Sequence, residues 1–466
     1  MAESKVVQII KKLDQKEVKL LDKFVKSPFF NQHTDVIRLF DYLQKTISEG
    51  GSALSNEQIF KVIFKDEKLD LQKLHYINSY LLKLIESFLA WQQWEEDNIE
   101  QQIFLLRAYR LHKLDDQFRR LYKKLEETLE KLPLRNNQYH NLRYKMQIEQ
   151  LKFAREGRTG DLQLQELSDA QDIAYIAEKL YNACTLLSHQ AVFKKEYDPG
   201  LLPNVLEHIE NSGRIEEPAI ALYYYAYLSL SNIEKVENFH QLKKLLQLHR
   251  DRFDASELRG LYLVATNFCI RRINRGEGSF FKEIFEIYKS GLDARVFLEN
   301  GMLSRWTFNN IVVAAVKLKD FGWAEKFINE QIDKINPEHR EGTHSFNLAY
   351  FYFEKGDYDK AMPLLTQMEH DDVLHNLFAK ATLAKMYYKL AEFDSLDNLL
   401  QSFKIYIRRK KILGYHKDNY LNFIRYMQKL TQVNIFDKSA KAALSEQIQN
   451  EKMLAEREWL LESLKG

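Results

Sequence analysis

Apolar positions in the N-terminal part of the chain recur at helical spacing between short polar interruptions. Asp14 precedes an apolar stretch and is followed three residues later by Glu17, which is the pattern of a helix that starts with a capping box. Ser55 and Gln58 repeat this pattern before a second apolar stretch. Residues 71–96 then predict one long helix. Its inward-facing stripe is Leu74, Asn78, Leu81, Ile85 and Phe88.

The clearest pattern lies in residues 347–361, where one helical pattern is interrupted by Gly356 and Asp357 and a second one follows. Gly356 tolerates the left-handed backbone that ends a helix, and Asp357 can cap the next helix. Ala361 is small enough for two helices to cross closely at this position. Pro363 lies inside the second helix, which it should bend. The stretch therefore predicts two helices that pack back on one another.

The same order of small and apolar positions recurs on both sides of this stretch. In the central unit the positions are Leu348, Ala349, Tyr352, Gly356, Tyr358, Ala361 and Leu365. The order recurs 37 residues earlier at Ile311, Val312, Ala315, Lys319, Phe321, Ala324 and Ile328, and 35 residues later at Leu383, Ala384, Tyr387, Ala391, Phe393, Leu396 and Leu400. Because Lys319 and Ala391 replace the glycine of the turn, we expect those two turns to adopt a different geometry.

Three units in register, with a period near 34 residues, resemble the tetratricopeptide repeat. The resemblance is clear over residues 305–403 and faint elsewhere. It implies an all-α solenoid of stacked helical hairpins, which binds a protein or peptide in its concave groove and has no reactive group of its own. We expect four parts: an N-terminal helical module (1–97), divergent helical hairpins (98–304), tetratricopeptide-like repeats (305–437) and a capping part (438–466) formed by one helix over 438–464.

The resemblance places a set of polar and aromatic side chains on the inner wall of this groove. They are Asn310, Lys317, Asn347, Tyr350, Lys385, Tyr388 and Lys389. Such side chains attract and hydrogen-bond carboxylates, so the wall suits an acidic or carboxylate-ended peptide, and we expect Lys385 and Lys389 to be exposed on it. Trp306, Thr343 and Phe378 occupy positions where the carboxylate-clamp form of this family has basic residues, so we predict a generic binding groove rather than that clamp. A purely structural role for the wall side chains stays open.

A second candidate is the basic segment 404–429, which contains eight Lys and Arg residues and one Asp, for a net charge of +7. Aromatic residues are interleaved with these charges. Its candidate polyanion contacts are Arg408, Arg409, Lys410, Lys411, Lys417 and Arg425. Cations hold phosphates and exposed rings stack on bases, so the segment could bind nucleic acid. In the alternative interpretation it is a solvated face whose aromatic rings point inward.

Composition supports a helical protein and restricts its partners. Only 16 glycines and 7 prolines occur in 466 residues, which leaves little material for sheet turns or flexible linkers. The formal net charge of +2 gives no strong field toward nucleic acid or membrane. We expect Cys184 and Cys269 to be buried free thiols rather than a disulfide or metal site. Without a signal-like or membrane-spanning apolar run, we expect a cytoplasmic protein with no membrane partner.

The motifs of common enzymes are not found in this sequence. It has no glycine-rich phosphate loop followed by Lys and Ser or Thr, no Gly-x-Ser-x-Gly and no His-Glu-x-x-His. The Gly-x-x-Gly of residues 157–160 lacks flanking strands, and we interpret it as a turn between helices. We therefore predict a non-enzymatic interaction scaffold without a catalytic residue, cofactor or metal, with the nucleic-acid-binding helical repeat as the alternative.

Overall fold

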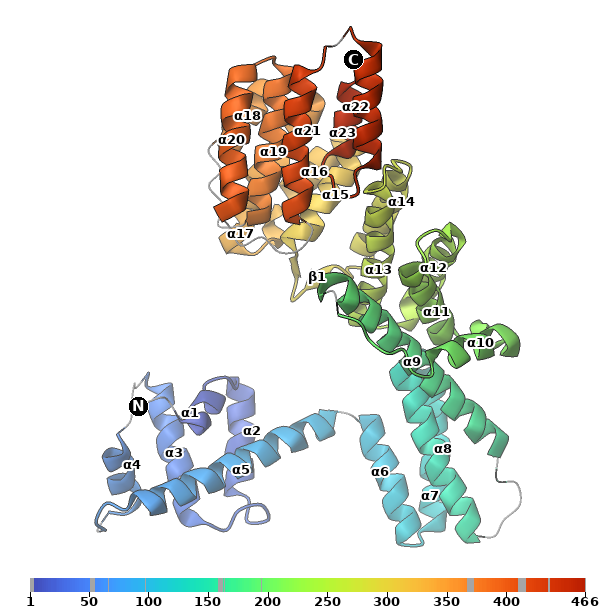
Figure 1. Ribbon diagram of the computed structural model, residues 1–466. Helices are drawn as coiled ribbons and strands as arrows, with labels where there is room; N and C mark the ends of the chain where they lie inside the picture. Colours follow the sequence, from blue (N-terminus) through green and yellow to red (C-terminus); the bar gives the residue numbers. More distant parts are fainter. Residues whose placement is uncertain are drawn as a thin grey trace. The chain divides into compact units, whose positions relative to one another are not determined.

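The computed structural model describes residues 4–50, 55–65, 67–96, 98–157, 162, 164–193, 195–366, 373–409, 416–434 and 436–465 (Figure 1). Over these residues the chain forms 23 α-helices and three short 3-10 helices. Two short strands, β1 (Leu298–Glu299) and β2 (Met302–Leu303), also occur in the described residues and pair antiparallel. The protein is therefore all-α, as predicted. None of the helices in the described ranges is long and apolar enough to cross a membrane.

The chain divides into two compact units. The first unit comprises residues 1–131 and 145–163, and the second comprises residues 132–144 and 164–466. This division differs from the four parts expected from the sequence, which stay a prediction.

The N-terminal helices of the first unit form a small bundle around one long helix. They are α1 (Lys5–Ile10), α2 (Gln15–Lys26), α3 (Thr34–Ser48), α4 (Asn56–Ile63) and α5 (Leu71–Glu96). Leu81, Ile85 and Phe88 of α5 are fully buried against the shorter helices. Both predicted capping boxes are present, one before α2 and one before α4. The helix predicted over 71–96 is confirmed at both ends.

The rest of the first unit contains α6 (Asn98–Leu111), α7 (Asp115–Lys131) and the C-terminal part of α8 (Asn137–Gly157). The Arg110 guanidinium is buried between these helices, and its nitrogens lie 3.0 Å from a Glu149 oxygen and 2.6 Å from a Glu156 oxygen. The ring of Phe118 stacks on that of Phe153 with 4.1 Å between centroids. A paired buried charge and stacked rings thus join α6 and α7 to α8.

The second unit is built mainly of helical hairpins. Its helices are α9 (Leu164–Phe193), α10 (Leu202–Ser212), α11 (Pro218–Ser231), α12 (Val236–His249), α13 (Ala255–Ile273), α14 (Phe280–Asp293), α15 (Arg305–Lys317), α16 (Phe321–Gln331), α17 (Pro337–Lys355), α18 (Tyr358–Thr366), α19 (Val373–Lys389), α20 (Phe393–Arg409), α21 (His416–Gln432), α22 (Lys438–Asn450) and α23 (Arg457–Ser463), with 3-10 helices at Arg214–Glu216, Arg250–Arg252 and Ile332–Lys334. Helices α15, α17 and α19 each pack on the next helix of the chain, and α17 also contacts both α15 and α19. This serial packing fits a solenoid.

The predicted close crossings are confirmed in these hairpins. Ala324 of α16 and Ala361 of α18 are fully buried. Ala361 belongs to an apolar cluster that also contains Phe353 of α17 and Leu383 of α19. A side chain larger than a methyl group would therefore collide with neighbouring helices at this position.

The turns that join the paired helices share one backbone geometry, which corrects the expectation for Lys319 and Ala391. These two residues have φ angles of 60° and 58°, so they adopt the left-handed conformation that Gly356 adopts with φ 85°. After each of them the next N–H donates to the carbonyl five residues back, as Asp357 does to Tyr352 over 2.9 Å. The N–H of the left-handed residue itself donates to the carbonyl three residues back, as Gly356 does to Phe353 over 3.0 Å. These two bonds form the Schellman motif, which closes the helix whether or not glycine is present.

The two cysteines are free and buried, as predicted. Cys184 lies in α9 and Cys269 in α13, both within the main apolar cluster of the second unit. Burial disfavours the thiolate, and it raises the pKa of Cys184 to about 12. Both thiols are therefore packing groups rather than nucleophiles.

The single helix predicted over 438–464 is wrong. The chain forms α22 up to Asn450 and α23 from Arg457, and residues 451–456 connect them in a non-helical path. Glu456 has a φ angle of 57°, which a continuous helix cannot contain. Arg457 donates to the carbonyl oxygens of Ile448 and Gln449, both over 2.7 Å, so it closes the end of α22 from the next helix.

Candidate functional site

The predicted groove wall has a mixed exposure. Asn310 and Lys389 are exposed, and Lys317 and Tyr388 are half-buried. Asn347, Tyr350 and Lys385 are buried, and the side chain of Lys385 is only 1% exposed. The expected exposure of Lys385 is therefore wrong, because another part of the chain covers it.

That covering part is residues 454–464, the connection after α22 together with α23. The Lys385 Nζ donates to Glu456 Oε2 over 2.9 Å. The ring of Tyr388 meets that of Trp459 edge to face, with 5.6 Å between centroids. Glu456 and Trp459 of the segment therefore face the side of α19 that the repeat resemblance assigns to the groove.

Side chains of the wall helices before α19 lie in the field of the same acidic segment. On α15, burial would lower the pKa of Lys317, but Glu354, Glu456 and Glu462 around it raise this pKa above the ordinary value. The Lys317 Nζ donates directly to Glu354 Oε1 over 3.0 Å. On α17, burial and the neighbouring carboxylates of Glu354, Glu456 and Glu458 raise the pKa of Tyr350. Lys317, Tyr350, Lys385 and Tyr388 are therefore brought together around one acidic segment, and we call them the Lys-Tyr wall.

Glu456 is the central anion of this contact. Burial alone would raise the pKa of its carboxyl group, but Lys385 and then Lys317 outweigh burial and hold the pKa below the ordinary value. Glu456 therefore stays charged inside the contact. Its left-handed backbone turns the chain just before α23, and its carboxylate accepts the bond from Lys385 of α19. Helix α23 itself packs beside α21 (Figure 1).

Apolar and polar contacts hold the segment in place beside this ion pair. Trp459, Leu460 and Leu464 share an apolar cluster with Ala381 and Ala384 of α19. The Ala455 N–H donates to the Asn419 carbonyl oxygen of α21 over 3.3 Å, and the Asn422 Nδ2 donates over 2.7 Å to the carbonyl oxygen of Met453, which directly precedes the segment. The segment is thus held by one ion pair and by the burial of its apolar side chains.

The side chain of Asn347 is hydrogen-bonded within the protein rather than exposed to a partner. Its Nδ2 donates to Asn309 Oδ1 and to the Thr343 carbonyl oxygen, each over 2.7 Å. This bond between neighbouring wall helices connects α15 and α17. The side-chain oxygen of Asn347 is buried and accepts no bond in this structure.

The basic segment 404–429 is only partly described. Arg408, Arg409 and Lys417 are exposed, whereas Arg425 pairs with Glu451 of the connection after α22. Lys410 and Lys411 lie outside the described residues. The rings of Phe403, Phe423 and Tyr426 are buried, so they point inward as the solvated-face interpretation requires. These three rings cannot stack on bases in this conformation.

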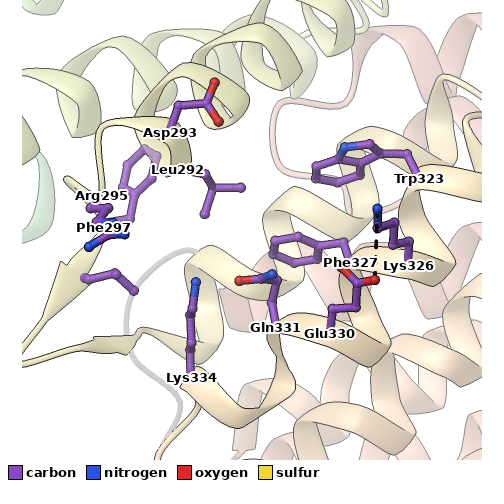
Figure 2. A pocket seen from close by; sticks show the side chains of 11 residues that line it. Leu292, Asp293, Arg295, Phe297, Trp323, Lys326, Phe327, Glu330, Gln331 and Lys334 are labelled. Atoms are coloured by element: carbon purple, nitrogen blue, oxygen red, sulfur yellow. Dashed lines mark ion pairs between the residues drawn. The ribbon is translucent and has the colours of Figure 1, made fainter.

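A pocket of about 320 Å³ lies between the end of α14, the β1–β2 ribbon and α16 (Figure 2). Its lining rings are those of Phe297, Trp323 and Phe327. Charged residues of both signs surround these rings, and the closest pair is Lys326 and Glu330 at 4.0 Å. The pocket could take an amphipathic side chain. Sequence reasoning missed it, because its aromatic residues come from two elements with no common motif.

Comparisons of the chain with protein-family models, with curated proteins and with solved structures returned no match. Within the described ranges, no three His, Cys, Asp or Glu side chains are grouped so that they could hold a metal ion.

Proposed function

We propose that this protein is a non-enzymatic interaction scaffold of the tetratricopeptide-like type, which binds a partner protein or peptide through the inner wall of its helical hairpins. The observation that carries the proposal is the Lys-Tyr wall. It holds a peptide segment with acidic residues against the wall helix α19, through Lys385 and Glu456 and through Tyr388 and Trp459. A surface that binds one such segment within the chain has the chemistry to bind one from a partner.

The shared hairpin turn supports the repeat interpretation. Lys319, Gly356 and Ala391 close successive hairpins with the same left-handed geometry, although their side chains differ. Units of equal geometry stack with a constant rotation and create an extended binding face. A scaffold in the cytoplasm fits the buried free cysteines.

Nucleic-acid binding is the weaker alternative. It retains the exposed Arg408, Arg409 and Lys417 as phosphate contacts. The buried rings of the same segment and the pairing of Arg425 with Glu451 count against it.

Site-specific photo-crosslinking in the native cell tests the proposed function. A photoreactive residue replaces Asn310 or Lys389, which are exposed at the wall, and a control replaces the exposed Asn329 on α16. We expect a nuclease-resistant protein adduct at the two wall positions and none at the control. The crosslinked protein should then bind the purified chain. Equal labelling at all three positions, or adducts that nuclease removes, would contradict a wall-specific protein scaffold.

A further inference from the structure

The segment 454–464 resembles a bound ligand more than a continuation of the repeat. It approaches the wall after a break in the helical path. Its polar contacts run to α19 through Glu456 and to α21 through the Ala455 N–H, and Arg457 also bonds the end of α22, on which α23 packs. Glu456 contacts Lys385, which is 71 residues earlier in the sequence. The contact depends on a few anchoring groups.

The anchoring groups define a short chemical pattern. A carboxylate at Glu456 pairs with a buried lysine, and an aromatic ring three residues later meets the ring of Tyr388. Glu458 and Glu462 add negative charge near Lys317. Leu460 supplies the apolar contact that is fully buried. An acidic amphipathic helix with one tryptophan thus satisfies the Lys-Tyr wall.

The net free energy with which the segment 454–464 binds the wall is limited, because its central contact is a buried ion pair. Desolvating Lys385 and Glu456 offsets much of their mutual attraction, so the ion pair sets the register more than it adds affinity. Covalently, the segment is connected to the hairpins through the residues that follow α22, and its apolar side chains join the cluster that α19 to α22 share. A local opening of residues 451–464 exposes the wall while the hairpins before it keep their own core.

We propose that the Lys-Tyr wall is an exchangeable binding site for an acidic, tryptophan-bearing amphipathic helix, which the chain's own residues 454–464 occupy until a partner helix of the same chemistry replaces them. This inference rests on the proposed scaffold function and specifies the partner class. Charge complementarity, visible in the pairing of Lys385 with Glu456, selects such a partner over a neutral or basic one.

The test uses the full chain and a labelled synthetic peptide with the sequence of residues 451–465. A second peptide carries Gln at the positions of Glu456, Glu458 and Glu462. The binding protein is the double variant Glu456→Ala, Trp459→Ala, which loosens the internal segment and leaves the wall intact. Fluorescence anisotropy measures binding of each peptide to this variant and to the wild-type chain.

We expect the double variant to bind the acidic peptide at least about tenfold more tightly than the wild-type chain, because the competing internal segment is weakened. The Gln peptide should bind neither protein. Adding Lys385→Met to the double variant should abolish binding of the acidic peptide. A folded double variant that binds no better than wild type, or that binds both peptides equally, overturns the inference. So does a variant that dimerises and ignores the peptide.

Hydrogen exchange of the wild-type chain tests the same inference without a variant that must fold. We expect the amides of residues 454–464 to exchange together and at least about tenfold faster than those of α17. Equal protection of the two regions contradicts an exchangeable segment. The crosslinking experiment at Asn310 and Lys389 tests the scaffold function independently of this inference. A protein adduct at those positions would still support the scaffold function if the acidic peptide did not bind.

Discussion

Among single residues, Lys385 has the most unusual environment, because a long cationic side chain is rarely almost fully buried. Among the described residues, Glu456 is the carboxylate that pairs with it, over 2.9 Å. Removing one member of such a pair leaves the other charge buried without compensation, which is costly, whereas removing both is often neutral.

This asymmetry gives the first prediction. Lys385→Met should lower the free energy of unfolding by about 3–5 kcal/mol, and the double variant Lys385→Met, Glu456→Met should recover most of that loss. Chemical denaturation measures both values. The matched control is Lys360→Met, which removes the exposed pair with Asp357 and should change stability far less. Equal losses for the single and double variants would show that Lys385 contributes by packing alone.

A second residue-scale prediction concerns His140, which lies in the 132–144 part of the second unit. Burial, with Arg143 nearby, lowers the pKa of His140 to about 4. The unfolded chain therefore binds an extra proton between about pH 6.5 and pH 4, so folding stability falls as the pH falls through this window.

We expect His140 to contribute a loss of about 3 kcal/mol between pH 7 and pH 4. Urea denaturation of the wild-type chain and of His140→Gln at both pH values isolates this contribution. The variant should be less stable than wild type at pH 7, and its free energy of unfolding should decrease less between pH 7 and pH 4. If the two proteins lose the same stability on acidification, His140 is not responsible.

At the level of helices and turns, the shared left-handed residue predicts opposite effects for reciprocal substitutions. Ala391→Gly removes the strain of a Cβ in this conformation and should raise the free energy of unfolding by about 0.5–1 kcal/mol. Gly356→Ala introduces that strain and should lower it by a similar amount. No atom lies within 4 Å of the site where a Cβ on Gly356 would stand, so the effect is purely one of the backbone.

Denaturation midpoints at constant m-value measure both changes. Lys113 has a φ angle of 57°, so the substitution Lys113→Gly is an independent test of the same geometry in the first unit. A loss of stability in Ala391→Gly would mean that glycine's flexibility in the unfolded chain outweighs the relieved strain.

Local signals in the sequence predicted the helices well. The capping box of Asp14 and Glu17 marked the start of α2, since both bonds join residues three apart. The break before Glu456 could not be predicted in this way. The break brings Glu456 to Lys385, and no local pattern records a contact at that separation.

Contacts that local patterns do not record also explain why the predictions for the turns and for the exposure of the wall were wrong. The identity of Lys319 suggested a different turn, but the hydrogen bonds of the helix end set the backbone and tolerate the strained residue. The resemblance grouped Lys317, Tyr350 and Lys385 on one groove wall, and this grouping stays a prediction. It could not indicate that residues 454–464 cover them.

Across the whole chain, the net charge of +2 limits how strongly the basic segment can attract a polyanion. We predict weak binding of single-stranded nucleic acid, with a Kd of roughly 10⁻⁴ to 10⁻⁶ M at physiological salt. Neutralising Arg408, Arg409, Lys410 and Lys411 should weaken it further, and the salt dependence should lose a slope of about 0.7 for each phosphate contact removed.

A mobility-shift titration at several salt concentrations measures this binding. The matched control neutralises Arg425, which already pairs with Glu451 and should have little effect. Tight, sequence-selective binding by the wild-type chain would instead make nucleic acid the principal partner.

The distance along the chain between Lys385 and Glu456 has a consequence for biosynthesis. Translation at about 5–20 residues per second adds the intervening 71 residues in several seconds. During this interval the hairpins through α19 can fold while the wall still lacks its own anion. A partner helix present at the ribosome therefore meets an open site before the internal competitor has been made, so the timing of the encounter, as well as affinity, would decide which helix is bound first.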